Sequence, residues 1–431
     1  MPTSSLEHRF SEHAGQPAER IGRKRLLFLC QTLPFPPDGG VQIRSYNILR
    51  LLSYKYDVTA LCFFRRATRP SPEAVEAGIA GLSGMAQVEA FQIPQEFSRL
   101  RLLWDHVRSA TSRRPYTVFA YDSAEFAKRL KELLRFERFD LVHLDSLDLS
   151  SYLPALNGLP VACTHHNIES DLLARRALTE ESPWKRYYFR IQASLLRSEE
   201  ARWCPKIDLN AVVSDADGSR LTAIAPGANV ITIPNGVDTK AFRPSPSTAS
   251  ARSIVFVGGY SWYPNRDALY YFGEEILPRI RRTTNVAVTW VGRAPTSVID
   301  ECSRKYGIRL TGYVEDIRPF VESAACYVVP LRIGGGTRLK ILDAWAMGKA
   351  VVSTSVGCEG LQAVDRENIL IRDDADAFAS SVVELLEDVS LRERIGRAAR
   401  QTAEEIYDWD VIGEKLHDAY DRLISPSRAV A

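Results

Sequence analysis

The chain has 431 residues, of which 45% are hydrophobic and 25% charged, and its formal net charge is +2. The length predicts two or three domains, and the composition is that of a globular protein. The balance of charges speaks against a nucleic-acid binder, which usually carries a strong basic excess on one face.

The cysteines indicate neither a metal site nor a disulfide framework. No two of the seven stand at C-x-x-C spacing, and most lie in apolar runs, as Cys30 and Cys326 do. Small apolar cysteines of this kind are typical of a reducing compartment, so we expect a cytoplasmic protein. Residues 1–22 are polar and lack an apolar stretch, which favours a disordered tail over a secretory signal.

Short apolar runs alternate with amphipathic stretches over residues 23–242. Runs without in-out alternation are typical of parallel strands that are buried on both faces. The expected strands are 25–30, 57–64, 87–93, 140–144, 160–165, 209–214 and 229–233. Because helical stretches stand between most of them, this α/β pattern predicts a first Rossmann-like domain with a doubly wound parallel sheet.

A stretch rich in Ser, Pro and Ala, 243–253, predicts a linker, after which the alternation restarts. The later expected strands are 253–259, 286–292, 308–312, 326–331, 349–354 and 368–371. They predict a second Rossmann-like domain over 254–406, followed by a C-terminal helix over 407–425 that crosses back to the first domain. Ligands of such sheets bind at the carboxyl ends of the strands, so two domains facing across a cleft would hold the site between them.

The segment 330–361 contains the clearest signs of a binding site. Three consecutive glycines follow an expected strand: Gly334, Gly335 and Gly336. Thr337 comes next, as a natural N-cap for a helix expected over 338–347. A helix N-terminus behind a glycine loop offers unpaired N–H groups and the positive end of the helix dipole, which suits a diphosphate.

Three side chains of the expected helix extend this candidate site. Arg338 and Lys340 add positive charge, and Asp343 lies farther along, where a carboxylate can accept hydrogen bonds from a ribose. The alternative is an ordinary loop–helix joint with a Lys340–Asp343 ion pair on the surface.

With these residues the segment resembles the donor site of glycosyltransferase family 4, the retaining GT-B enzymes. The closest subgroup has a donor loop written GGGTRLKILEA. Family members carry two acids here, of which the second contacts the ribose and the first usually contacts the donor sugar. The second acid corresponds to Asp343, whereas the first corresponds to Gly335. The resemblance therefore implies the diphosphate site, including Thr337 and Leu339, and leaves the contact with the sugar open.

Other glycine-containing segments match the same family in chain order. Gly39 and Gly40 open the first helix, and Gly258 and Gly259 follow the first strand of the second half. In the family these loops lie near the donor, so the resemblance implies donor contacts for these glycines. For Gly39 and Gly40, a tight strand-to-helix turn without such a contact is an equal alternative. Tyr313 stands in a segment that resembles the turn that holds the base, mostly through backbone atoms.

The segment 163–170 ends a strand with two histidines. Family members carry a His at this strand end that hydrogen-bonds the donor sugar near the reacting carbon. His166 is the better match and His165 is its neighbour. Glu169 either orients the site or caps the following helix. The resemblance thus implies that His166, Arg338 and Lys340 form the catalytic set.

The resemblance implies a retaining, nucleotide-sugar-dependent transferase, of hexosyl or related type, that acts without a metal or a separate cofactor. The acceptor would be a carbohydrate or a lipid-linked sugar in bacterial polysaccharide or glycolipid assembly. Two alternatives remain open. A nucleotide-sugar epimerase on the same architecture would need a cluster of acid/base carboxylates, which the sequence does not reveal. A non-catalytic nucleotide-sugar-binding protein is suggested by the missing acid at Gly335.

Two basic stretches, 98–114 and 184–197, interleave arginines with apolar residues. One interpretation is peripheral contact with an anionic membrane, at the inner face of the cytoplasmic membrane, where a lipid-linked acceptor would be found. The other, which is more common, is a solvated helix face whose apolar side belongs to the core.

Overall fold

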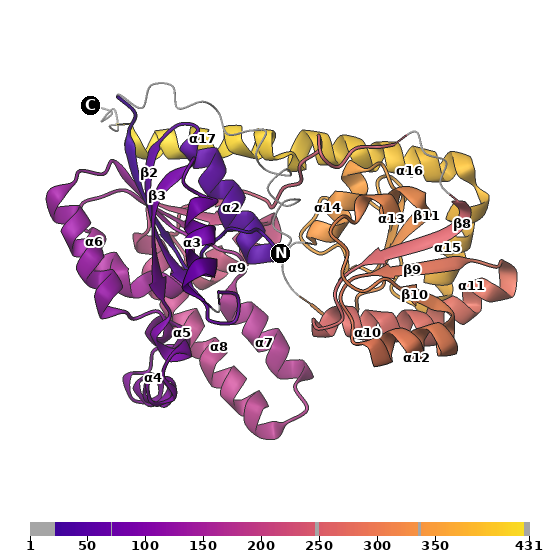
Figure 1. The fold of residues 1–431 in the computed structure, drawn as a ribbon, viewed down its shortest axis with the longest axis horizontal. Coiled ribbons are helices and arrows are strands. Elements are labelled where there is room, and N and C mark those ends of the chain that lie inside the picture. The colour runs from indigo at the N-terminus through magenta and orange to yellow at the C-terminus, as the bar shows by residue number, and fades with distance from the viewer. Residues whose placement is uncertain (1–21, 70, 246–249, 335–337, 426–431) are drawn as a thin grey trace. The chain divides into compact units, whose positions relative to one another are not determined.

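The chain folds into two compact units (Figure 1). The computed structural model describes residues 22–69, 71–245, 250–334 and 338–425. The first unit comprises the chain up to Ile233 together with the residues from Gly413 onward, and the second runs from Pro234 to Ile412. Each unit has its own parallel sheet and its own hydrophobic core.

The first unit contains a seven-stranded parallel sheet with the order β3-β2-β1-β4-β5-β6-β7. Its strands are β1 (Arg25–Cys30), β2 (Asp57–Phe64), β3 (Ala86–Gln92), β4 (Leu141–Leu144), β5 (Val161–Thr164), β6 (Leu209–Val212) and β7 (Val230–Thr232). Leu27 pairs with Thr59 on one side and with Val142 on the other, so β1 lies where the strand order reverses. The predicted strands are confirmed, and the short strands of the sheet centre are almost wholly buried.

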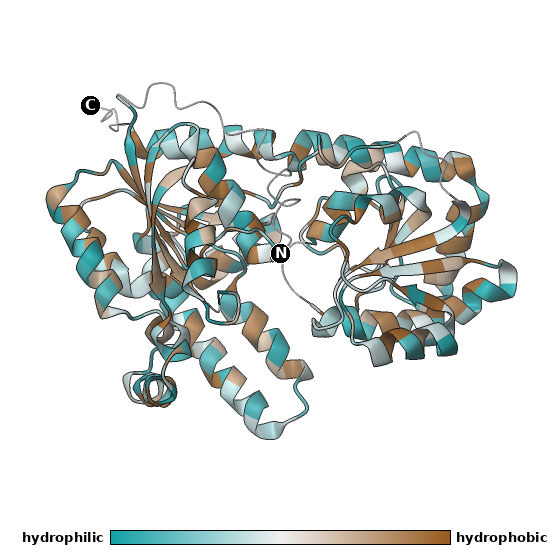
Figure 2. Ribbon diagram, viewed as in Figure 1, coloured by the Kyte–Doolittle hydropathy of each residue, from teal (hydrophilic) through white to brown (hydrophobic). Residues whose placement is uncertain are grey.

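Helices lie on both sides of this sheet, with α6 on one side and α2 and α3 on the other (Figure 1). The α-helices are α2 (Gly40–Ser53), α3 (Pro72–Ala80), α4 (Arg99–Ser112), α5 (Tyr116–Ala120), α6 (Ala124–Phe136), α7 (Glu169–Thr179), α8 (Pro183–Trp203) and α9 (Asp215–Ile224). Short 3-10 helices are η2 (Pro94–Glu96), η3 (Leu147–Leu156) and η4 (Cys204–Lys206). In α6, Phe126, Leu130 and Leu133 recur at helical spacing and are buried. Figure 2 shows the same contrast for the whole unit, with hydrophobic strands and helices of mixed character.

The second unit repeats this architecture with six parallel strands in the order β10-β9-β8-β11-β12-β13. Its strands are β8 (Ser250–Val257), β9 (Ala287–Val291), β10 (Ile308–Leu310), β11 (Ala324–Val329), β12 (Val351–Ser353) and β13 (Leu370–Ile371). Val255 pairs with Thr289 and with Tyr327, which places β8 at the reversal of strand order. Both units therefore have the doubly wound topology that the sequence predicted.

The remaining helices belong to the second unit, apart from the later part of the last one. They are α10 (Tyr263–Tyr271), η5 (Phe272–Ile276), α11 (Leu277–Thr283), α12 (Thr296–Tyr306), α13 (Arg318–Ser323), α14 (Leu339–Ala346), α15 (Ala375–Glu387), α16 (Val389–Thr402), η6 (Ala403–Tyr407) and α17 (Trp409–Ile424). Asp374 caps α15 by accepting a hydrogen bond from the N–H of Ala377 at 2.8 Å. The acidic residues at this helix start therefore have a structural role.

The division between the units falls at Ile233–Pro234 and not within the expected linker 243–253. Val237 is 3% exposed in the core of the second unit, and its N–H donates to the carbonyl of Tyr407 at 2.8 Å. The turn after β7 is therefore already part of the second unit. Residues 246–249 of the expected linker and residues 1–21 of the expected tail lie outside the described residues.

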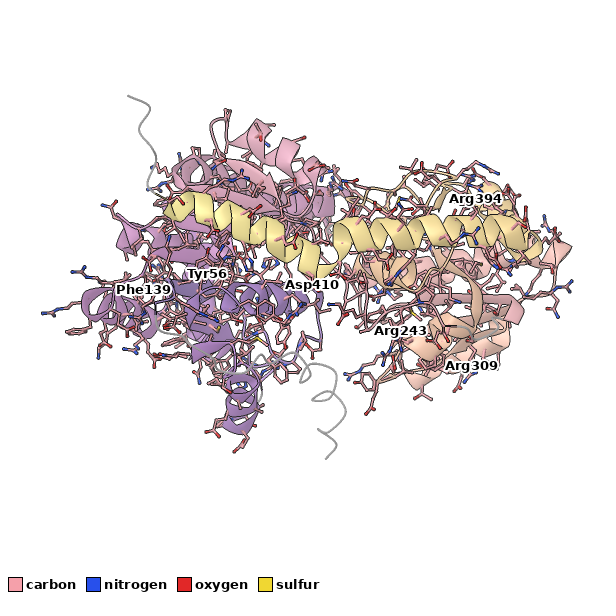
Figure 3. The ribbon with its side chains drawn as sticks, turned by 90° about the horizontal axis from the view of Figure 1, so that it is seen from above. Tyr56, Phe139, Arg243, Arg309, Arg394 and Asp410 are labelled. Atoms are coloured by element: carbon pink, nitrogen blue, oxygen red, sulfur yellow. The ribbon has the colours of Figure 1, made fainter. Side chains whose placement is uncertain are left out.

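The later part of α17 packs within the first unit. An imidazole nitrogen of His417, Nε2, lies 2.7 Å from the carbonyl oxygen of Leu51, and Tyr420 is fully buried. Figure 3 shows Tyr56 beside this helix, where its hydroxyl donates a hydrogen bond to Asp421 at 3.3 Å. The apolar stripe of the helix, read from the sequence as structural, is buried in this way.

Candidate functional site

In the second unit, predicted donor residues gather where the strand order reverses. Gly258 and Gly259 follow β8, and Gly334 and the helix α14 follow its neighbour β11. The carboxyl ends of parallel strands at such a reversal leave a crevice, which is the usual ligand site of doubly wound sheets. The topology thus brings together glycines that are about 75 residues apart in the sequence.

Asn265 holds the loop after β8 in place. Its side-chain amide donates to the carbonyl of Gly259 at 3.0 Å, while the N–H of Gly258 donates to the carbonyl of Val291 at 2.8 Å. A Cβ atom at Gly258 would lie 2.7 Å from both Asn265 and the ring of Phe256. Only glycine allows the backbone to approach this closely.

Lys340 points into the second unit. Its ammonium lies 2.6 Å from the side-chain oxygen of Asn265 and 4.3 Å from the centre of the Phe256 ring. Burial, together with the nearby charge of Arg338, lowers the pKa of Lys340 to about 7. The alternative interpretation of a surface ion pair between Lys340 and Asp343 is therefore wrong, because Lys340 is turned toward Asn265.

Arg338 lies at the start of α14 and is 3% exposed. Its guanidinium donates to the carbonyl of Val356, with distances of 3.2 and 3.3 Å. Gly334 has a φ of +140°, and a Cβ atom there would lie 2.9 Å from a guanidinium nitrogen of Arg338. The glycine therefore lets the loop fold directly against this buried cation.

The helix starts later than expected. It runs from Leu339 to Ala346 with Arg338 at the N-cap position, so the predicted capping role of Thr337 is corrected. Gly335, Gly336 and Thr337 themselves lie outside the described residues. Leu339 packs against the core, and Asp343 lies half-buried on the same helix. The backbone of Arg338, with φ −87° and ψ 75°, is not helical, and the helix begins at the next residue.

Tyr313 stands at the same edge of this sheet. Its side chain is 58% exposed, and the guanidinium of Arg293 lies 4.3 Å from the centre of its ring. The carbonyl of Arg293 accepts a hydrogen bond from the N–H of Tyr260 at 2.8 Å, which ties this region to the loop after β8. An exposed aromatic ring that carries a cation on one face is thus adjacent to the candidate donor loop.

In the first unit, Asp145 lies where the strand order reverses. It directly follows β4 and is fully buried. One of its carboxylate oxygens, Oδ2, accepts hydrogen bonds from the Ser45 hydroxyl at 2.6 Å and from the Cys30 thiol at 3.1 Å. Ser45 lies on α2, the helix that Gly39 and Gly40 open. These two predicted glycines therefore begin the helix that reaches Asp145.

Two histidines complete the surroundings of Asp145. Nε2 of His166 lies 2.8 Å from the carbonyl oxygen of Asp145 and 3.4 Å from its carboxylate, and Nε2 of His143 lies 3.5 Å from the other carboxylate oxygen. The opposite nitrogen of His143 is 2.6 Å from the hydroxyl of Tyr420 on α17. A polar chain thus runs from α17 through His143 and Asp145 to His166.

The surroundings of Asp145 favour the ionised form of its carboxyl. Burial alone would raise the pKa of its carboxyl, but the two neighbouring histidines, His166 foremost, outweigh it and lower the pKa well below the ordinary value of 3.8. The two atoms near Nε2 of His166 are the carbonyl oxygen and a carboxylate oxygen of Asp145, and both are acceptors. This nitrogen therefore carries a proton. Its Nδ1 forms no hydrogen bond among the described residues.

The other residues of this predicted segment have different surroundings. His165 is 5% exposed, its Nε2 lies 3.0 Å from the side-chain oxygen of Asn210, and burial lowers its pKa to about 4. It is a neutral core residue. Glu169 does not cap α7, because the N–H and hydroxyl of Ser170 are bound by Glu200.

Several residues of the two sites were missed from the sequence. Asp145 could have been found, because it stands directly after an expected strand, where ligand groups of parallel sheets lie. Asn265 and Tyr420 carried no such signal, since nothing in their local pattern distinguishes them from ordinary helix residues. The sequence also did not reveal that Asp148, Glu169 and Glu200 line one pocket of the first unit.

Within the described ranges, no group of three or more His, Cys, Asp or Glu residues is arranged to hold a metal ion. In the same part of the chain, no helix combines the length and apolar character needed to cross a membrane.

Comparison with known families gives matches for both halves of the chain. Residues 38–241 match the family described as Glycosyltransferase Family 4, and residues 251–388 match the one described as Glycosyl transferases group 1. The two matches follow the two sheets in order.

Curated relatives are also glycosyltransferases. Phosphatidyl-myo-inositol mannosyltransferase of Mycolicibacterium smegmatis is 27% identical over 46% of this chain and 53% of its own length. Lipopolysaccharide core biosynthesis glycosyltransferase LpsE of Rhizobium meliloti is 33% identical over 27% of this chain and 34% of its own length. The chain thus spans about half the length of the first curated relatives that it matches.

Solved structures share the fold along almost the whole chain. Sucrose-phosphate synthase from Thermosynechococcus elongatus has a TM-score of 0.67 at 17% identity and covers 93% of this chain and 99% of its own. Anabaena HepE in complex with UDP has a TM-score of 0.65 at 14% identity, with coverages of 92% and 100%. At these identities the likeness concerns the fold, which is the GT-B combination of two Rossmann-like domains.

Proposed function

The chain belongs to glycosyltransferase family 4, and from that premise we propose that it transfers a sugar from a nucleotide-diphosphate donor to a hydroxyl group of an acceptor. We further propose that the transfer retains the configuration at the sugar carbon and needs neither a metal nor a separate cofactor. The acceptor belongs to cytoplasmic polysaccharide or glycolipid assembly in this proposal. Mannosyl and lipopolysaccharide-core transferases among the relatives support it.

The observation that carries the proposal is the pair of cations at the start of α14. Arg338 and Lys340 are held together behind a glycine loop, although each charge disfavours the other. A diphosphate placed there would neutralise both, and its developing charge on departure from the sugar would be stabilised by the same groups. Asp343, farther along the helix, is the proposed partner of the ribose.

In this proposal the first unit contributes His166. Its Nε2 is fixed by Asp145, so that the imidazole is oriented before any ligand binds. The free Nδ1 is the atom that would contact a hydroxyl of the donor sugar. Gly39, Gly40, Gly258, Gly259 and Tyr313 are proposed as donor contacts through loop backbone and, for Tyr313, through the base-binding turn.

Titration with nucleotides tests the donor site directly. We expect the folded protein to bind one of UDP, GDP or ADP in a calorimeter, and CMP more weakly because it lacks the second phosphate. Arg338→Ala and Asp343→Ala should each weaken that binding by about tenfold or more, the effect of losing a charge-assisted hydrogen bond.

Arg332→Ala is the matched control for this titration. Arg332 is an exposed arginine of the same loop region whose guanidinium pairs with Asp267 at 2.6 Å. Its removal should leave nucleotide affinity within about twofold, as for a typical surface ion pair. If no nucleotide binds to the folded protein, the donor site has been assigned wrongly. If a nucleotide binds but its sugar conjugates are never turned over or hydrolysed, the chain is a binding protein and not a transferase.

We also propose that α4 and α8 contact an anionic membrane, as part of the search for a lipid-linked acceptor. The two helices touch each other, since Gln192 on α8 donates to Ser109 on α4 at 3.1 Å. Large apolar side chains on their outer faces are exposed: Leu100, Leu103 and Trp104 on α4, and Trp184, Tyr187 and Ile191 on α8. The neighbouring cations Arg99, Lys185 and Arg190 are exposed as well. Exposed Trp and Leu flanked by cations are typical of interfacial helices.

Vesicle sedimentation tests this membrane contact. We expect the protein to bind phosphatidylcholine vesicles that contain phosphatidylglycerol, and to release as salt rises, because each surface cation contributes about 1 kcal/mol. The double change Leu103→Glu and Trp104→Glu should abolish sedimentation. Phe136→Glu is the control, since Phe136 is 76% exposed on α6, away from α4 and α8. Equal sedimentation of all three proteins would contradict a role for α4.

A further inference from the structure

The polar chain of the first unit runs from the C-terminal helix to His166. Its four members in order are Tyr420 on α17, His143 in β4, Asp145 after β4 and His166 after β5. Tyr420 and His143 are 277 positions apart in the sequence, so the polar chain forms only in the fold. The side chains of Tyr420, His143 and Asp145 are fully buried, whereas that of His166 is 7% exposed. Solvent therefore reaches the polar chain at its His166 end.

The position of the proton on His143 follows from the neighbours of its two ring nitrogens. Nε2 lies 3.5 Å from Oδ1 of Asp145, and neither atom has another hydrogen-bond partner among the described residues. Nδ1 lies 2.6 Å from the hydroxyl of Tyr420. A neutral imidazole carries one proton, and a carboxylate only accepts. All four atoms are paired only if Tyr420 donates to Nδ1 and Nε2 donates to Asp145.

The surroundings of His143 stabilise this order of protons. Burial raises the pKa of the Tyr420 hydroxyl, which thus keeps the proton that it donates. Burial also lowers the pKa of His143, which favours its neutral form. The ring of His143 is stacked on that of Phe28, with 4.3 Å between the ring centres and 11° between the planes. A turn of the ring that exchanged its nitrogens would bring an acceptor to face Asp145.

Asp145 transmits this order to His166. Its Oδ2 accepts hydrogen bonds from the Ser45 hydroxyl at 2.6 Å and from the Cys30 thiol at 3.1 Å, which fixes the plane of the carboxylate. Oδ1 is then left for His143. The same Oδ2 and the carbonyl oxygen of Asp145 lie 3.4 and 2.8 Å from Nε2 of His166. In a neutral His166 the proton therefore lies on Nε2, and Nδ1 is an acceptor.

We propose that Tyr420 and His143 are positioning residues for the transfer, which act through Asp145 to hold His166 with its proton on Nε2. The inference rests on the proposed function and deepens it, because it gives the direction of the contact with the ligand. Nδ1 of His166 accepts a hydrogen bond from a sugar hydroxyl and donates none. The C-terminal helix, through Tyr420, thus contributes to the site in the first unit.

Nitrogen NMR of the full chain, labelled in its histidine rings, tests the order of protons without any substrate. Spectra at about pH 8, where ordinary histidines are neutral, distinguish ring nitrogens with a proton from those without one. The signals that vanish in His143→Gln and His166→Gln identify the two residues. We expect a protonated Nε2 and an unprotonated Nδ1 for both. A proton on Nδ1 of His166 would overturn the proposal.

Tyr420→Phe removes only the hydroxyl at the inner end of the polar chain. Because His143 and Asp145 are then held less firmly, the two nitrogen shifts of His166 should move toward each other. Turnover of the sugar conjugate whose nucleotide binds, hydrolysis included, should fall about fivefold or more, as for one lost hydrogen bond. Nucleotide affinity should stay within about twofold, since the proposed nucleotide site lies in the second unit.

Tyr56→Phe is the matched control for Tyr420→Phe. It also removes a tyrosine hydroxyl that bonds to α17, at Asp421, but this hydroxyl is not part of the polar chain. The His166 signals should stay in place, and turnover should stay within about twofold. Equal effects of the two changes would mean that Tyr420 serves only the packing of α17, and the proposal would fall.

Two changes at His143 separate positioning from packing. His143→Leu cannot donate to Asp145 and should lower turnover about tenfold or more, whereas the amide of His143→Gln can donate in place of Nε2 and should keep turnover within about threefold. Equal losses in both variants would show a structural role only. If the unchanged protein turns over no sugar conjugate but its spectra show the expected protons, the proposed function has failed and the positioning of His166 has not.

Discussion

Replacing Asp145 by Ala should lower the free energy of unfolding of the first unit by about 3–5 kcal/mol, the cost of removing one member of a buried charged network. The change leaves the Ser45 hydroxyl and the Cys30 thiol without their common acceptor, and it removes a negative charge that acts on Arg44, which is 1% exposed. Calorimetric unfolding of the unchanged protein and the variant checks this result.

A control and a pH series sharpen this prediction. Asp171→Ala removes an acid that pairs with Arg175 at 2.9 Å in a half-exposed position, and should cost less than about 1 kcal/mol. Because folding lowers the pKa of Asp145, its contribution to stability is complete above its ordinary value of 3.8 and is lost as the pH falls below it. If Asp145→Ala and Asp171→Ala cost the same, Asp145 does not hold the network together.

The same network predicts an effect on catalysis. Asp145→Asn keeps the size of the side chain but turns one carboxylate oxygen into a donor, which opposes the proton on Nε2 of His166. If His166 contacts the donor sugar as proposed, turnover should fall more than nucleotide affinity. Equal losses in both would mean that the change has simply unfolded the first unit.

Replacing Lys340 by Met should weaken binding of the nucleoside diphosphate by about tenfold to a hundredfold at pH 7, the range for one charged hydrogen bond. Lys340 has a pKa of about 7 in the free protein, so only part of the population carries the charge at this pH. A diphosphate favours the charged form, and its binding therefore takes up protons.

The pH dependence of that binding has a definite sign. Between pH 7 and 9 the affinity of the unchanged protein should fall as Lys340 loses its proton, whereas Lys340→Arg should keep its affinity, because arginine stays charged. Calorimetry in buffers with different heats of ionisation measures the proton uptake. If the affinity of the unchanged protein stays constant over this pH range, Lys340 does not bind the diphosphate through its charge.

As the pH rises, the loss of the proton from Lys340 should weaken nucleotide binding but increase the free energy of unfolding. The pKa of Lys340 is lower in the folded chain than its ordinary value of 10.5, so the unfolded chain holds more protons between about pH 7 and 10.5. The free energy of unfolding of the ligand-free protein therefore rises with pH over this interval, and Lys340→Met should remove that part of the slope. A residue that serves ligand binding at some cost in stability behaves in this way.

Much of the fold could be predicted from the sequence because it depends on the pattern of neighbouring residues. The run 25–30 is apolar at every position but the first, and the structure places it in the centre of a sheet. The glycines at 258 and 334 were readable too, since close backbone approach and a positive φ restrict those positions to glycine. The helix start was predicted a residue too early, because capping depends on the conformation of Arg338 and not only on the presence of Thr337.

The sequence by itself therefore determined the two doubly wound domains, the family and the pairing of a glycine loop with Arg338 and Lys340, because periodicity, glycine and charge act over a few neighbouring residues. Only the tertiary structure decided which side chains share a site. Asp145 meets Ser45 across 100 residues and His166 across 21, and Lys340 turns to Asn265 instead of to Asp343. The acids of the pocket come from α7, α8 and the start of η3. Such contacts follow from the order in which parallel strands assemble, and no local pattern encodes that order.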